Sequence, residues 1–384
     1  MEPYAAATAT DVLSTFEHQE LARVAFDIGA KYGGRRFDDH EAAREQWADL
    51  ARAGIAGLSL PPAFGGGGGG MLELCIAGER LAAGGFPAPG LVLTTGIVAS
   101  VLVRHGTPEQ QADYLPGIAD GSTKFCFALT EPDSGSNAMN MKTKIRRDGD
   151  DWRLTGQKTY ISGVDTAQSM LVVAREQETG GFTLVVLPLP DQRITMSRVE
   201  VDMPAFDRQW SVFFDDVRVP SSAIIGDVGH GSAALFDGLN PERLVVGAQA
   251  VGIGRWCLER AAGYATTRNV FGVPIGAHQA LQHPLAEALI SLDAAWALVE
   301  RAARRYDEGA VAGLESNIAK VAACDAGLLA ADRALQTFGG SGYTTDTMIL
   351  QRFLHMRLLR SIPVSREMAL NHIATAGLGL PRSY

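Results

Sequence analysis

The sequence predicts an α+β fold in which a region of strands separates two helical regions. Residues 8–120 show helical segments broken by glycine and proline, residues 121–228 contain short apolar or alternating runs, and residues 229–376 return to a helical pattern. Because strands and helices do not alternate along the chain, a parallel sheet of Rossmann type is disfavoured.

Length and composition agree with a chain of several globular domains. With 384 residues, of which 46% are apolar and 20% are charged, the chain can bury two or three cores of ordinary composition. We expect three domains, which comprise residues 1–120, 121–228 and 229–384.

Charge, hydropathy and cysteine spacing exclude several classes of protein. A net charge of −9 argues against a nucleic-acid partner, and no run of about 18 apolar residues indicates a membrane span. The N-terminus lacks the basic and then apolar pattern of a signal peptide. Four well-separated cysteines without a CxxC pair disfavour a disulfide framework and a zinc site, so we expect no metal. A reducing cytoplasm fits these features best.

In the first helical region, six consecutive glycines at residues 65–70 are the most unusual feature. They lack the Lys-Ser/Thr pair that ends a phosphate-binding loop, and no apolar strand precedes them. We therefore expect a mobile loop between helices.

The central and C-terminal regions differ in the period of their apolar residues. Four short runs bounded by Gly, Asp and Pro predict strands at residues 152–155, 170–173, 182–187 and 211–214. In the last region, spacings of three and four predict an amphipathic helix with one apolar stripe. The stripe consists of Leu285, Leu289, Leu292, Trp296, Val299 and Ala303.

Two segments of the central region have the composition of a cofactor site. In residues 125–136 a strand runs into a turn rich in Pro, Asp, Ser and Gly, which suits a cofactor ring or phosphate oxygens but also an ordinary solvated turn. In residues 156–163 Tyr160 lies between hydroxyl residues at a strand end. It is suited to cover a flat cofactor or to pack across strands.

Two further segments lie in the C-terminal region. Residues 268–279 place Arg268 at a helix end, followed by a glycine-containing turn and by His278 at the start of the next helix. This arrangement suits a pyrophosphate, although a histidine there is more often a cap or a core residue. Residues 336–343 fit a helix C-terminus closed by glycine.

These four segments, in this order and spacing, resemble the acyl-CoA dehydrogenase family, and the resemblance covers essentially the whole chain. Its most specific parts are residues 129–136, 268–279 and 338–340, and the closing residues 378–384 look like one bacterial branch. The resemblance implies an N-terminal helical domain, a central β-barrel-like domain and a C-terminal four-helix bundle.

The family resemblance also implies non-covalently bound FAD and a tetramer built from dimer pairs. The flavin would be lined by Phe127, Leu129, Thr130 and Ser136 and covered by Tyr160, Ile161 and Ser162. The FAD of a neighbouring subunit would be reached by Arg268, Phe271, Gln279, Gln336 and Gly340, and Gly339 and Ser365 would also contact the cofactor. Ser136 and Arg243 would lie near the CoA moiety.

The reaction implied by the resemblance is α,β-dehydrogenation of an acyl-CoA thioester to the trans-2-enoyl-CoA, in fatty acid metabolism and lipid degradation. A carboxylate takes the α proton while the β hydride passes to flavin N5. The site must stabilise an enolate-like charge by hydrogen bonds to the thioester carbonyl, and these bonds are stronger where water is excluded.

The position of the base departs from the commonest family pattern. Most members carry a glutamate in the stretch that matches residues 361–365, Ser-Ile-Pro-Val-Ser, which has no carboxylate here; Glu367 lies about one helical turn further on. The isovaleryl- and long-chain-type members place the base on an earlier helix, directly before an arginine. That position is Glu242, followed by Arg243. Without catalysis, Glu242 would be explained as a first-turn acid after an Asn240 N-cap and Pro241.

Some questions stay open at this point. Pro363 has no N–H to give the thioester carbonyl, so either the register differs by a residue or the carbonyl depends more on the flavin ribityl hydroxyl. We expect electron-transfer flavoprotein as electron acceptor and a homotetramer or dimer. The alternatives are a flavin oxidase or monooxygenase on the same fold, or one subunit of a heterotetramer. The sequence does not specify the acyl group, although earlier-helix members often take branched or bulky ones.

Overall fold

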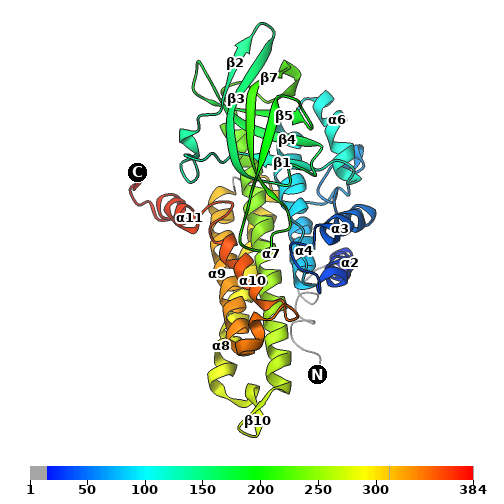
Figure 1. Cartoon of the computed structure of the whole chain (residues 1–384), viewed down its shortest axis with the longest axis vertical. Coiled ribbons are helices and arrows are strands. Elements are labelled where there is room, and N and C mark those ends of the chain that lie inside the picture. Colours follow the sequence, from blue (N-terminus) through cyan, green and yellow to red (C-terminus); the bar gives the residue numbers. More distant parts are fainter. Residues whose placement is uncertain (1–14, 311, 384) are drawn as a thin grey trace. The chain divides into compact units, whose positions relative to one another are not determined.

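The computed structural model describes residues 15–310 and 312–383, which form two compact units. One unit contains residues 15–50, 70–88 and 243–383, and the other contains residues 51–69 and 89–242. We call them the helical unit and the sheet unit after their main elements (Figure 1).

A mostly antiparallel sheet forms the centre of the sheet unit. Its strands run in the order β6-β7-β3-β2-β4-β5-β8, and β1 pairs in parallel with β4. Their bounds are β1 Phe125–Ala128, β2 Lys144–Asp148, β3 Asp151–Ser162, β4 Ser169–Glu176, β5 Phe182–Pro188, β6 Ile194–Val199, β7 Gln209–Val219 and β8 Ile224–Ile225. All four strands predicted from the apolar runs are confirmed, within β3, β4, β5 and β7. The predicted run of strand into turn at residue 125 is confirmed as β1.

Strands β2 and β6 were not predicted, because most of their residues are polar and exposed. By contrast, β4 is buried on both faces, so its apolar residues form one continuous run. Leu171 and Val173 belong to one apolar core, whereas Met170 and Val172 belong to a second core on the opposite face.

Helical segments cover the first of these two cores. They are the π-helix η2 (Leu91–Ala99), α5 (Ser100–His105) and α6 (Pro108–Ala119), which lies beside the sheet in Figure 1. Leu102, Leu115 and Ile118 bury their side chains in the same core as Leu171.

The glycine run connects the short 3-10 helix η1 (Pro62–Phe64) to α4 (Met71–Ala83), as expected of a connection. Backbone hydrogen bonds fasten it, however, including those from Gly67 N to Gly57 O and from Gly69 N to Leu58 O. A Cβ at Gly66 would lie 2.2 Å from Leu60 O, so glycine permits this close approach. The expectation of a mobile loop is replaced by a hydrogen-bonded turn.

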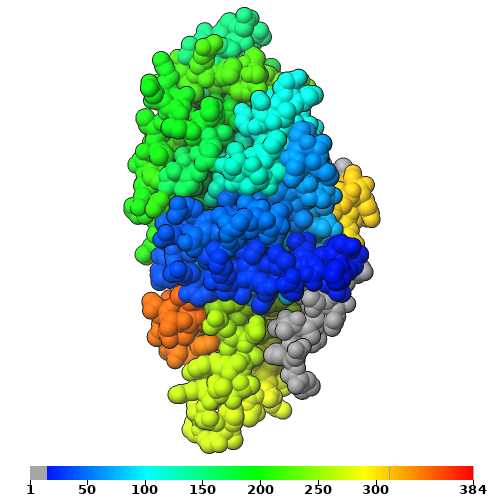
Figure 2. All heavy atoms as spheres, turned by 90° about the vertical axis from the view of Figure 1, so that its right-hand side faces the viewer, coloured from blue at the N-terminus to red at the C-terminus, as the bar shows by residue number. Residues whose placement is uncertain are grey.

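The helical unit consists of helices that pack along one another. They are α2 (Phe16–Tyr32), α3 (His40–Arg52), α4, most of α7 (Ser232–Thr267), α8 (Gln279–Asp307), α9 (Gly313–Phe338), α10 (Ile349–Leu359) and α11 (Arg366–His372). The predicted apolar stripe lies on α8, where Leu292, Val299 and Ala303 are fully buried. Between α7 and α8, a hairpin of β9 (Asn269–Val270) and β10 (Val273–Pro274) projects beyond the ends of both helices (Figure 1), and the yellow-green atoms of this part of the chain form one end of the helical unit in Figure 2.

Helix α7 begins at Ser232, so the alternative explanation of Glu242, which placed it after an N-cap at Asn240, is wrong. Its first turns are held because Ala234 and Leu235 are buried in a core of the sheet unit, and Pro241 lies inside the helix. A proline there removes one backbone hydrogen bond but does not end a helix that packing supports. Glu242 is therefore not in the first turn, and stabilisation by the helix dipole does not explain it.

The predicted α+β class is confirmed, with helical elements before and after a central β region. In the part of the chain that the structure describes, no helix combines the length and apolar character needed to cross a bilayer. Among the same residues, no three His, Cys, Asp or Glu side chains are grouped as metal ligands would be.

Candidate active site

Glu242 and Arg243 are consecutive buried residues in the interior of α7. Only 5% of Glu242 and 7% of Arg243 is exposed, and the division between the two units falls between them. Within the helical unit, Arg243 affects the titration of His372 on α11. Burial, and secondly the positive charge of Arg243, hold the pKa of His372 below its usual range. Arg243 therefore lies near the helix that follows residues 361–365.

The stretch at residues 361–365, where most members of the resembled family carry a carboxylate, is fastened by side chains of α9. Lys320 is fully buried and donates to Val364 O at 2.7 Å. Asp325 pairs with Arg360 at 2.9 Å and with Arg366 at 2.8 Å, one on each side of the stretch. Glu367 follows in the first turn of α11 and is exposed.

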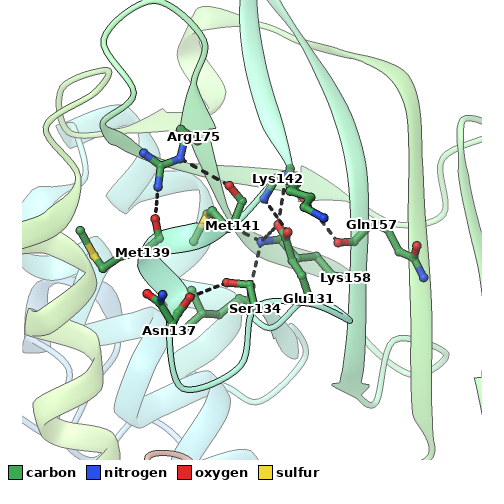
Figure 3. A network of polar contacts seen from close by, with 11 residues as sticks. Glu131, Ser134, Asn137, Met139, Met141, Lys142, Gln157, Lys158 and Arg175 are labelled. Carbon is green, nitrogen blue, oxygen red and sulfur yellow. Dashed lines mark hydrogen bonds and ion pairs between the residues drawn. The ribbon is translucent and has the colours of Figure 1, made fainter. Parts of the chain in front are cut away.

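The turn after β1 is held from within the sheet unit (Figure 3). Glu131 accepts hydrogen bonds from Lys142 N at 2.6 Å and Thr143 N at 2.9 Å. Lys158 of β3 donates to Glu131 Oε1 at 3.0 Å and to Leu129 O at 2.8 Å. Residues 129–143 are thus a loop whose two ends are tied to one buried ion pair.

Tyr160 has a backbone conformation that tyrosine rarely adopts. Its φ is +57°, at an irregularity where the register between β3 and β7 shifts, and 63% of the residue is exposed. A strained residue at a bulge re-aims its side chain out of the strand's alternation. The structure therefore shows no buried cross-strand packing for Tyr160, and the exposed ring suits a cofactor face.

The other predicted flavin residues of the sheet unit differ in burial. Phe127, Leu129 and Thr130 are half-buried and Ser136 is exposed in the loop. Ser162 lines a small crevice with Thr94 and Asp207. Ile161 is only 2% exposed and packs in a core, so its side chain supports the sheet and a cofactor contact could come only from its main chain.

In the helical unit, Arg268, Gly339 and Gly340 border one open hollow of about 580 Å³. Helix α9 ends at Phe338 with Gly339 at a φ of +57°, which confirms the predicted glycine-closed C-terminus. No described atom lies within 4 Å of a Cβ built at either glycine, so the backbone is open to a ligand. Phe338 stacks on Tyr264 at 4.5 Å and forms part of the wall.

The predicted FAD contacts of the helical unit that do not line this hollow are Phe271, Gln279, Gln336 and Ser365. Arg268, Gln279 and Gln336 are exposed, and Phe271 is 95% exposed at the turn of the hairpin. His278 occupies the N-cap position of α8 without a side-chain capping bond. Ser365 is the N-cap of α11. Its hydroxyl oxygen accepts a hydrogen bond from Met368 N and so stabilises the start of that helix.

Lys158 and Glu131 were missed as a pair, although both lie in segments that the sequence singled out. Along β3, Trp152 and Leu154 are buried at alternate positions, and Lys158 continues the same series. A lysine at an inward position predicts a buried acidic partner. The partner is 27 residues away in the sequence, which is why strand periodicity alone does not identify it.

Comparison with known protein families places the whole chain within one group. Three family models match it, described as the N-terminal, middle and C-terminal domains of acyl-CoA dehydrogenase, at residues 16–122, 126–217 and 229–378. Acyl-CoA dehydrogenase FadE12 of Mycobacterium tuberculosis (strain ATCC 25618 / H37Rv) is 42% identical over 387 residues, covering 98% of this chain and 100% of the relative.

Solved structures agree with the sequence comparison. Glutaryl-CoA dehydrogenase from Mycobacterium smegmatis in complex with FADH2 has a TM-score of 0.90 at 26% identity, covering 98% of this chain and 97% of its own. Butyryl-CoA dehydrogenase from Megasphaera elsdenii has a TM-score of 0.88 at 26% identity, covering 97% of this chain and 100% of its own.

Proposed function

The chain belongs to the acyl-CoA dehydrogenase family, and from this membership we propose that it catalyses FAD-dependent α,β-dehydrogenation of an acyl-CoA thioester with Glu242 as the base. The observation that carries the assignment of the base is a buried carboxylate in the interior of α7, directly before Arg243, in a chain whose residues 361–365 contain no carboxylate. An acid in the first turn of a helix is explained by its interaction with the helix dipole. Glu242 lies in the interior of α7, so this explanation does not apply to it.

The residues present fit FAD. The exposed Tyr160 ring and the loop at residues 129–136 suit the isoalloxazine ring, and the hollow beside Arg268, Gly339 and Gly340 suits the negatively charged phosphates. FAD, when bound, supplies an acceptor for the hydride from the β carbon of the substrate. Because Arg268, Gln279 and Gln336 are exposed, we propose that they bind the FAD of a neighbouring subunit in a homo-oligomer.

Glu242 does the acid–base work in this proposal. Its carboxylate takes the α proton of the acyl chain, which is a weak acid in water, and burial surrounds the carboxylate with protein rather than solvent. Arg243 supplies a positive charge one residue further along, which suits the CoA side of the substrate. We assign proton removal to Glu242 and ligand attraction to Arg243.

Polarisation of the thioester carbonyl depends on donors other than residue 363. Pro363 has no N–H, and Ile362 N donates to Leu358 O at 3.1 Å. Lys320 binds the carbonyl of Val364, and Asp325 pairs with Arg360 and Arg366, so the chain is held on both sides of the proline. We propose that neither Ile362 N nor residue 363 polarises the thioester carbonyl, so that a donor outside residues 362–363 would have to do so.

Anaerobic titration of the purified holoenzyme with a panel of linear, branched and aromatic acyl-CoA thioesters tests the function. We expect at least one thioester to bleach the flavin and to yield the 2-enoyl-CoA, with re-oxidation by electron-transfer flavoprotein. If no thioester bleaches the flavin, the proposal is contradicted. Fast formation of peroxide in air with a substrate that lacks CoA would favour an oxidase or monooxygenase instead.

The amount of bound flavin distinguishes a self-sufficient enzyme from one subunit of a mixed assembly. Expressed alone, a homo-oligomer is expected to retain about one FAD per chain. A chain that retains flavin only when a second subunit is co-expressed would indicate a heterotetramer.

A further inference from the structure

One buried ion pair in the sheet unit has no part in the proton and hydride transfers described above. Lys158 on β3 is 0% exposed, and Glu131 in the turn after β1 is 4% exposed. Buried charges of this kind persist only when a partner and further hydrogen bonds compensate them. Both conditions are met here, and the contacts of the pair show what it holds.

The contacts converge on the two ends of the loop at residues 129–143 (Figure 3). Lys158 Nζ donates to Leu129 O at the start of the loop, and Glu131 accepts from the backbone N–H groups of Lys142 and Thr143 at its end. A direct backbone bond from Thr159 N to Thr130 O, 2.9 Å long, joins the loop to β3 beside the pair.

The interior of the loop has further hydrogen bonds of its own. Glu131 and Ser134 exchange two backbone hydrogen bonds of 3.1 Å, and Ser134 Oγ donates to Asn137 O at 2.7 Å. Arg175 of β4 donates to the carbonyl oxygens of Met139 and Met141. These bonds shape the middle of the loop, whereas the fully buried Lys158 and its partner Glu131 join the two ends of the loop to the sheet.

The same lysine is two residues before Tyr160 on β3. The Lys158 side chain thus connects the segment that carries Tyr160, whose backbone has a positive φ and whose side chain is exposed, with the loop that contains Leu129, Thr130 and Ser136. On the proposed function, these two segments form the flavin-binding surface of the sheet unit. A change in the ion pair would shift one segment against the other.

We propose that Lys158, paired with Glu131, is a positioning residue for FAD, which holds the loop at residues 129–136 and the Tyr160 bulge in the arrangement that binds the flavin. The inference rests on the proposed function for its ligand. In this proposal the pair acts through the two segments that it joins, and it takes no part in the proton and hydride transfers.

The chain contains a matched control for this proposal. Lys142 lies in the same loop and donates to Asp133 at 2.7 Å, but both side chains are about 70% exposed. An exposed pair of this kind contributes little to stability or shape. Lys142→Met therefore removes a lysine and an exposed ion pair from the loop and leaves the side chains of the buried Lys158–Glu131 pair unchanged.

The main experiment measures the Kd of FAD for deflavinated wild-type protein, Lys158→Met and Lys142→Met by quenching of flavin fluorescence. We expect Lys158→Met to bind FAD about tenfold more weakly or worse, as for other residues that orient a binding group, and Lys142→Met to bind as the wild type. Circular dichroism establishes that each variant is folded. An unchanged Kd in folded Lys158→Met would overturn the proposal.

A second variant covers the case in which Lys158→Met does not fold. Glu131→Gln keeps the shape of the side chain and one acceptor oxygen while removing the charge of the pair. Its FAD affinity is expected to fall by about threefold to tenfold, since hydrogen bonds to a charged group are stronger than those to a neutral one. Wild-type affinity in Glu131→Gln would contradict the proposal equally.

The pH profile separates positioning by charge from mere space filling. Burial lowers the pKa of Lys158 to about 8, against the opposing effect of Glu131. Arg175 on β4 and the exposed pair of Lys142 and Asp133 also carry charge around the loop. The wild-type Kd for FAD is expected to rise as pH increases through about 8, and this rise is expected to be absent in Lys158→Met.

The outcomes distinguish the positioning proposal from the function on which it rests. If the wild type binds no FAD, the proposed function itself fails and the inference falls with it. If the wild type binds FAD with the same pH profile and affinity as Lys158→Met, only the positioning role is overturned.

Discussion

The catalytic role that we propose for Glu242 follows from its buried position in the interior of α7, which the neighbouring residues in the sequence do not reveal. Asn240, Pro241 and Glu242 form a typical helix start when viewed locally, yet the helix begins eight residues before Asn240, at Ser232. The carboxylate is consequently buried within a long helix, where a catalytic task explains it better than capping does.

A second residue-scale consequence concerns His355, which is buried against Phe37 in the helical unit. Burial, and secondly the charge of Arg352, lower the pKa of His355 to about 4. The unfolded chain therefore binds a proton below about pH 6.5 that the folded protein does not bind until about pH 4, so stability is lost as pH falls through this window.

We expect this histidine to account for up to about 3 kcal/mol of the stability lost between pH 6.5 and pH 4. Urea unfolding of wild type and His355→Gln at pH 7.5 and pH 5 measures it: the loss should be smaller in the variant. His230→Gln, at an exposed position, is the control and should behave as the wild type. Equal acid losses in wild type and His355→Gln would contradict the assignment.

At the scale of elements, the N-terminus of α4 depends on a side chain that is distant in the sequence. Asp307, the last residue of α8, accepts from Met71 N at 2.7 Å and from Leu72 N at 3.0 Å, while Glu73 accepts from Gly70 N. Gly70 has no side chain with which to cap the helix. Asp307 therefore supplies the cap from another helix.

Asp307→Ala should lower the free energy of unfolding by about 1 kcal/mol, the usual contribution of a helix cap. Asp307→Asn, which keeps one acceptor oxygen, should lose less. Asp332→Ala provides the comparison, because Asp332 is a half-exposed residue of α9 paired only with its neighbour Arg333 in the interactions described. Thermal unfolding of the three variants gives the order, and an Asp307→Ala value equal to that of Asp332→Ala would refute the cap.

Elements with a strong period could be predicted from the sequence, whereas those set by distant partners could not. The apolar runs within β4 and β5 and the stripe on α8 follow directly from burial. The start of α7 and the hydrogen-bonded glycine turn depend on partners in other segments, namely the core around Leu235 and the carbonyl groups of residues 57–61.

The candidate site shows the same division. Arg268 and the glycines at 339 and 340 were singled out separately, and the fold brings them to one hollow. The Lys158–Glu131 pair joins two segments that the sequence marked independently, but no local pattern shows that they meet. Long-range contacts of this kind are what the fold adds to the sequence.

At the scale of the whole molecule, family membership and the position of the base are separate conclusions. The three matched domains establish the family, but the matches do not specify which carboxylate removes the proton. Glu242 is the last residue of the sheet unit and Arg243 the first of the helical unit. The position of the base is therefore tested separately from family membership.

Anaerobic stopped-flow reduction of FAD-loaded Glu242→Gln by an acyl-CoA that bleaches the wild type tests the central claim most directly. Glu367→Gln, which removes the exposed carboxylate nearest in sequence to residues 361–365, is the control. We predict that Glu242→Gln retains FAD but reduces it at least about 100-fold more slowly, the scale of a lost general base, while Glu367→Gln keeps the wild-type rate. Flavin bleaching by Glu242→Gln at the wild-type rate would contradict the account.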